Sequence, residues 1–182
     1  MSEPKAPHPA KLFVTVFLND TSLFEEVAKS LSEKYGKIDI LSQWAAFDNT
    51  SYYEKEMGRN LQRRVIIFKD LIRQSDIADI KHFAISIEKE LSNGDDRNVN
   101  IDPGYLLMER FVLATCKNFA HKIYVGKGVY ADLTLIYKDG RYNTLPWTFP
   151  NYKDEKMIDF ISNVRKKYII DLKNQKIGNQ ND

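Results

Sequence analysis

The segment 11–18 constrains the fold more than any other part of the sequence. Its side chains should alternate between two faces, yet leucine, valine and phenylalanine occupy both sets of positions. A strand with only one buried face would carry a polar residue at every second position. We therefore expect a central strand of a sheet that is covered on both faces.

The next hundred residues alternate between helical and extended patterns. Ser22 and Glu25 fit a capping box, which predicts that a helix begins just after Ser22. The order of the patterns is βαββαβ, the arrangement of a ferredoxin-like domain. In chain order, the predicted elements are a strand over 11–18, a helix over 23–35, strands over 37–47 and 61–68, a helix from Ser75 to Asn93-Gly94, and a short strand over 99–101.

Beyond Pro103 the pattern is that of strands until residue 147, and Asp139-Gly140 is a strong signal for a two-residue hairpin. We expect an antiparallel β-meander here, followed by a last helix from about Asp154. The fold class is therefore α+β: a ferredoxin-like βαββαβ start extended by the meander, with helices packed on the sheet. The predicted organisation is a flexible arm over 1–10, a single domain over 11–172 and a flexible tail over 173–182.

Composition excludes several classes of protein. The 182 residues include 27 Lys and Arg against 25 Asp and Glu, a charge of +2 that is too small to argue for nucleic acid as a partner. The single cysteine excludes an internal disulfide and a cysteine zinc cage. No stretch approaches the roughly 18 apolar residues needed to cross a bilayer, and no secretory signal opens the chain. We expect a cytoplasmic protein without a membrane partner.

Familiar catalytic and cofactor motifs are missing from the sequence. It contains no P-loop, no dinucleotide-binding glycine motif, no serine nucleophile elbow and no zincin helix. The three histidines are too widely spaced to predict a metal site. The sequence names no cofactor.

Two titratable residues are the candidate catalytic pair. Asp102 precedes Pro103-Gly104, a pair that favours a type II turn and would aim Asp102 and Tyr105 at one rim of the sheet. His121 opens a predicted strand and can exchange a proton near neutral pH. Each residue also has an ordinary structural interpretation: a histidine bonded at a strand end, and an aspartate that satisfies turn amides. Sequence separation does not decide whether the two side chains meet.

The remaining candidate site residues would bind a ligand around that pair. Two lysines would hold an anionic group, two tyrosines would line the pocket, and two carboxylates would contact the ligand. The loop 50–58 supplies two of these residues, although solvated charges there are equally ordinary. These candidates are Tyr53, Glu56, Tyr105, Lys117, Lys122 and Asp132.

Four phrases in the sequence resemble one known family. They are FDNTSYYEKEMG, NIDPGYL, TCKNFAHKIYVGKGVYADLTLIYKDG and LPWTFPNY, and together they are similar to the bacterial domain of unknown function family 4416. The resemblance runs from Lys11 to about Tyr168. It implies no activity, because the family is uncharacterised. Its members are sometimes labelled GTP-binding, a label that the missing P-loop does not support here.

Two functions are expected from these residues. The first is binding of a small anionic or nucleotide-like ligand, with acid/base chemistry by His121 and Asp102 if the protein is an enzyme. The alternative is a binding module without chemistry that recognises RNA or a protein partner. The aromatic motif of an RNA-recognition strand is missing, so nucleic acid is the less favoured partner. The oligomeric state is not predicted.

Overall fold

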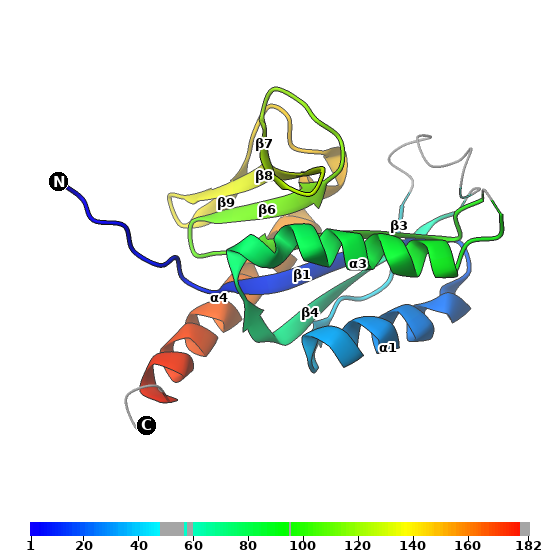
Figure 1. The fold of residues 1–182 in the computed structure, drawn as a ribbon, viewed down its shortest axis with the longest axis horizontal. Coiled ribbons are helices and arrows are strands. Elements are labelled where there is room, and N and C mark those ends of the chain that lie inside the picture. The colour runs from blue at the N-terminus through cyan, green and yellow to red at the C-terminus, as the bar shows by residue number, and fades with distance from the viewer. Residues whose placement is uncertain (48–56, 58–59, 95, 179–182) are drawn as a thin grey trace.

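The computed structural model describes residues 1–47, 57, 60–94 and 96–178. It is an α+β protein with one large antiparallel sheet and, in the described residues, three α-helices (Figure 1). The strands are β1 (Ala10–Leu18), β2 (Ile38–Leu41), β3 (Ala45–Ala46), β4 (Gln62–Ile72), β5 (Val99–Leu106), β6 (Arg110–Thr115), β7 (Lys122–Gly126), β8 (Val129–Lys138) and β9 (Arg141–Thr144). The helices are η1 (Thr21–Leu23), α1 (Phe24–Tyr35), η3 (Gln74–Asp76), α3 (Ile77–Glu90), η4 (Pro150–Tyr152) and α4 (Glu155–Gly178).

The sheet has β1 near its centre, as the apolar pattern of 11–18 predicts. The strand order is β2-β4-β1-β5-β6-β8-β7. In addition, β3 pairs with β4, and β9 pairs with β8. Every residue of β1 is buried. Figure 1 shows α1 and α3 in front of this part of the sheet and α4 behind it. Phe13 meets Phe160 of α4, with ring centroids 6.2 Å apart, so both faces of β1 are covered.

One charged residue lies inside this core. Lys11 has no exposed surface, and its ammonium donates to Asp39 of β2 at 2.8 Å and to Asp171 of α4 at 2.6 Å. Lys167 of α4 also binds both carboxylates. A buried ammonium is tolerated only when it is paired, so this cluster fixes where α4 lies on the sheet.

The predicted meander is wrong in its strand order. A meander would pair β6 with β7, but β6 pairs with β8. The long strand β8 pairs with β6 along one edge, and along its other edge it pairs first with β7 and then with β9. The hairpin at Asp139-Gly140 is confirmed, and both residues have the positive φ that such a turn requires. The antiparallel pairing itself is also confirmed.

The ends of several elements differ from the sequence patterns. The predicted capping box at Ser22 is not formed. The carboxylate of Asp20 caps the 3-10 turn η1 by accepting from the N–H of Ser22 at 2.9 Å, and α1 begins after Leu23 without a side-chain cap. The last helix, α4, continues to Gly178, past the predicted domain end at 172. Pro9, in the predicted arm, accepts a hydrogen bond from the hydroxyl of Tyr168. Within the described residues, no helix combines the length and the apolar composition needed to cross a membrane.

The predicted turn at Pro103-Gly104 is also wrong, because both residues lie inside β5. Side chains alternate along a strand, so Asp102 and Tyr105, three residues apart, point to opposite faces and not to one rim. Gly104 is needed for close packing: a Cβ there would lie 2.5 Å from the carbonyl oxygen of Val112 in β6.

Candidate functional site

The first half of β5 has a free edge inside the protein. β5 pairs with β1 along its whole length, but with β6 only from Gly104 to Leu106. Pro103 lies at the point of separation and has no N–H to offer to a neighbouring strand, which is why proline occurs at such edges. The two strands therefore diverge from Pro103 toward Val99.

Two charged side chains of α3 satisfy the backbone that β6 leaves unpaired. The N–H of Ile101 donates to Glu88 at 2.5 Å, and its carbonyl accepts from the ammonium of Lys81 at 2.8 Å. Glu88 and Lys81 are both buried. An unpaired buried amide is costly, so these contacts stabilise the open edge.

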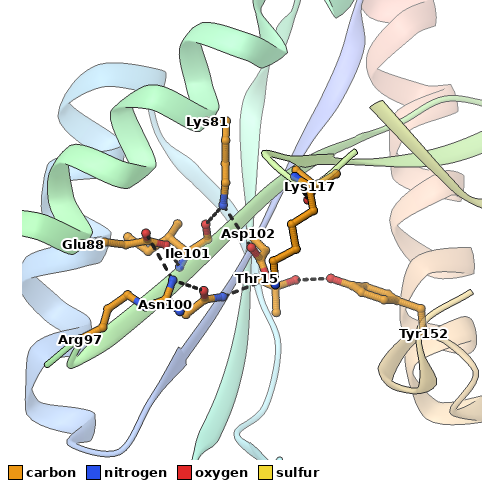
Figure 2. Close-up of polar contacts among 10 residues, drawn as sticks. Thr15, Lys81, Glu88, Arg97, Asn100, Ile101, Asp102, Lys117 and Tyr152 are labelled. Carbon is orange, nitrogen blue, oxygen red and sulfur yellow. Dashed lines mark hydrogen bonds and ion pairs between the residues drawn. The ribbon is translucent and has the colours of Figure 1, made fainter. Parts of the chain in front are cut away.

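The same side chains begin a polar network that ends at Asp102 (Figure 2). Lys81 donates to one oxygen of Asp102 at 3.1 Å, and the amide of Asn100 donates to the other at 2.9 Å. Arg97 donates to Asn100 at 2.9 Å and lies 3.8 Å from Glu88. Both oxygens of Asp102 are thus held in place, although its side chain is 29% exposed.

A cavity of about 470 Å³ occupies the gap between β5 and β6, a volume typical of small-molecule sites. We name it the β5–β6 cleft. Polar and charged groups reach it from β5, α3, β8 and the loop after β6, while η4 and the residue before it form a further wall. Its lining residues are Phe17, Lys81, Ile85, Glu88, Arg97, Asn100, Asp102, Leu113, Ala114, Thr115, Cys116, Lys117, Lys122, Asp132, Phe149, Asn151 and Tyr152.

Four of the predicted site residues line this cleft: Asp102, Lys117, Lys122 and Asp132. Lys122 and Asp132 are directly paired across β7 and β8, and their charged atoms are 3.5 Å apart. Figure 2 shows the side chain of Lys117 extending toward Asp102. The structure therefore brings four of the predicted residues together in one cleft, and their role in binding stays a prediction.

His121 has a different set of neighbours from Asp102. Its ring stacks on Trp147 with centroids 4.9 Å apart, and its Nε2 lies 3.6 Å from Asp132. Asp102 instead accepts hydrogen bonds from Lys81 and Asn100. The lining of the cleft includes Asp132 but, among the described residues, not His121.

Of the other three predicted residues, the structure describes one, Tyr105. Tyr105 is 7% exposed on the opposite face of β5, and its burial raises the pKa of its phenol. Tyr53 and Glu56 lie outside the described residues.

Sequence reasoning missed Lys81, Glu88, Arg97 and Asn151. One signal was available: Lys81 and Glu88 are seven residues apart, so they lie on one face of the helix, beside its apolar stripe. Charges in register next to a buried stripe indicate a polar contact inside the protein. Asn151 carries no such signal, because its surroundings come from distant parts of the chain.

Burial raises the pKa of Glu88, against the lowering effects of Lys81 and of the Ile101 N–H. Its folded-state pKa lies above the unfolded value, so folding takes up a proton and the contribution of Glu88 to stability falls as the pH rises from about 4.5. We expect Glu88→Gln to remove this slope. Denaturant unfolding from pH 4 to pH 8 should show the stability of the variant, relative to the parent, increasing with pH; a constant difference would contradict the assignment.

These features define an α+β protein with a polar cleft where two neighbouring strands of its sheet diverge. The chain belongs to the family described as Domain of unknown function (DUF4416), which matches residues 8–168. No curated protein and no solved structure matches it.

Proposed function

We propose that the β5–β6 cleft binds a small anionic or nucleotide-like ligand. The observation that carries this proposal is a cavity lined by charged side chains from four separate parts of the chain, which are α3, β5, β7 with β8, and the loop after β6. Lys117 and Lys122 would contact the anionic group, because both line the cleft. An ammonium held near apolar walls attracts an anion more strongly than one in open water.

Acid/base chemistry at this site would begin with Asp102. Lys81 and Asn100 fix both of its oxygens while part of the carboxylate surface still faces the cleft. A positioned carboxylate of this kind can accept a proton from a bound ligand. His121 would act through Asp132, which lines the cleft and lies 3.6 Å from the His121 Nε2, and so would be a positioning residue.

Isothermal titration with inorganic phosphate, pyrophosphate and AMP tests the ligand class. We expect Lys117→Gln and Lys122→Gln each to weaken the binding of the tightest anion about tenfold, the effect of losing one charged hydrogen bond. Lys138→Gln, at an exposed end of β8, is the matched control and should bind like the parent. Binding that is equal in all four proteins, or the failure of all three anions to bind, would contradict the proposal.

The acid/base role of Asp102 is tested separately, by the pH dependence of anion binding. If Asp102 handles a proton, Asp102→Asn should keep the affinity for the anion and change its pH dependence, because the amide does not titrate. An unchanged pH profile would remove the acid/base role and leave the binding proposal in place.

The alternative is a binding module for a protein or RNA partner. Exposed apolar side chains at the edge strand β7 favour it: Phe119, Ile123 and Tyr124 are each at least 60% exposed. A pull-down with the parent protein tests this alternative. A protein or RNA that binds the parent and Lys117→Gln, but does not bind Ile123→Ser, would favour this alternative over ligand binding in the cleft. RNA held by phosphate contacts would also dissociate steeply with salt.

We propose further that the first half of the chain is ferredoxin-like. The strand order β2-β4-β1-β5 supports this proposal, because α1 and α3 each connect two strands that are separated by one neighbouring strand.

We also propose that the protein works in the bacterial cytoplasm. The single cysteine, which is exposed, fits a reducing compartment. Labelling of Cys116 in intact cells under reducing and oxidising conditions would test the location.

A further inference from the structure

Asn151 is a buried side chain without a partner in the wall of the β5–β6 cleft. The residue is 1% exposed, and neither its amide nitrogen nor its amide oxygen makes a hydrogen bond within the part of the chain that the structure describes. It also lines the cleft. Most buried polar side chains in folded proteins are paired, so this residue requires an explanation.

The surrounding structure fixes Asn151 in this position. It is the middle residue of η4, whose turn is closed by a hydrogen bond from the Tyr152 N–H to the carbonyl of Phe149. Arg63 donates to the carbonyl of Asn151 at 3.2 Å, and the Tyr152 hydroxyl lies 3.0 Å from that of Thr15 in β1. Three hydrogen bonds thus fix the backbone around Asn151: the one that closes the turn, the one from Arg63 and the one between Tyr152 and Thr15. The contacts of η4 therefore fix this residue without giving its amide group a partner.

An amide offers one donor and one acceptor next to each other in a plane. The group that satisfies both at once must present an acceptor beside a donor, and the edge of a nucleobase has this pattern. The cleft also contains Phe149, an aromatic ring that is 42% exposed and on which a base can stack. Lysines in the same cleft supply the counter-charge for a phosphate.

We propose that Asn151 recognises the hydrogen-bonding edge of a nucleobase, so that the ligand of the cleft is a nucleoside phosphate. This inference rests on the proposed function, because it names the class of the anionic ligand. The base stacks on the exposed ring of Phe149. Asn151 is a specificity residue in this scheme, and Lys117 and Lys122 hold the phosphate.

Titrations with AMP, GMP, CMP and UMP test the proposal, with ribose 5-phosphate as the ligand that lacks a base. The parent protein should bind at least one nucleotide about tenfold or more tightly than ribose 5-phosphate, since two hydrogen bonds to the base are added. Equal affinities for all five would overturn the inference and leave the anion site intact. The failure of all five, and of phosphate and pyrophosphate, would overturn the proposed function as well.

Asn151→Leu separates recognition from structure. Leucine has nearly the same shape without the polar atoms, so we expect the preference of this variant for the tightest nucleotide over ribose 5-phosphate to fall about tenfold, while stacking on Phe149 remains. Its melting temperature in the absence of ligand should be unchanged or a few degrees higher, because an unpaired buried amide has been removed. Asn151→Ala provides a smaller second variant should leucine not fit. A folded variant of either kind that keeps the nucleotide preference would refute the role of Asn151.

Discussion

Replacing Lys11 by methionine is expected to lower the free energy of unfolding by about 3–5 kcal/mol, the usual cost of removing one partner from a buried ion pair. Lys11 is fully buried, and its ammonium contacts the carboxylates of Asp39 and Asp171 and the carbonyl of Lys69. Methionine keeps the apolar stem, so the loss comes from the two carboxylates left with fewer partners. Denaturant unfolding monitored by circular dichroism gives the difference directly.

Acid pH should reduce this effect. Burial acts to raise the pKa of Asp39, but hydrogen bonds and charges from Lys11 and Lys167 outweigh it, so the pKa lies below its ordinary value. The stabilisation is therefore present above about pH 4 and is lost as the pH falls through the folded-state pKa. The parent and Lys11→Met should converge on acidification.

A rescue variant and a surface control complete this test. Lys11→Met with Asp171→Asn should be more stable than Lys11→Met alone, because one uncompensated charge is gone. Arg73→Ala, which breaks an exposed ion pair with Asp76, should unfold like the parent. A stability of Lys11→Met equal to that of the parent would show that the cluster does not hold α4 on the sheet.

Gly104→Ala is expected to destabilise the protein by about 1–3 kcal/mol or more, the cost of overpacking a tight contact. The added Cβ would lie 2.5 Å from the carbonyl oxygen of Val112 and 2.9 Å from a methyl carbon of Leu113. The first of these neighbours is backbone, so β5 and β6 must move apart where they still pair. Thermal unfolding measures the loss.

The same substitution should also alter the β5–β6 cleft. The cleft opens because the two strands meet at Gly104 and diverge beyond Pro103, so separating them at Gly104 changes its width. The affinity for the tightest anion should fall in a protein that is still folded. Thr144→Val, at an exposed position of β9, is the control for a β-strand substitution and should change neither property. Normal stability in Gly104→Ala would contradict the close approach.

Local sequence patterns predicted the elements of this protein well. The apolar run in 11–18, the helical spacing in 23–35 and the Asp139-Gly140 turn each concern residues that are close in the chain, so propensity and periodicity decide them. The pattern failed at Pro103-Gly104, where a typical turn pair lies in a strand. There proline occupies a free edge and glycine a close contact, and neither condition is visible from neighbouring residues.

The sequence by itself determined an α+β fold with a central strand buried on both faces, and it placed polar candidates at Asp102, Lys117, Lys122 and Asp132. Only the tertiary structure decided that these residues share a cleft with Lys81, Glu88 and Asn151, and that His121 stacks on Trp147. The physical reason is that secondary structure follows from interactions a few residues apart, whereas a cleft depends on which distant strands pair and where that pairing ends.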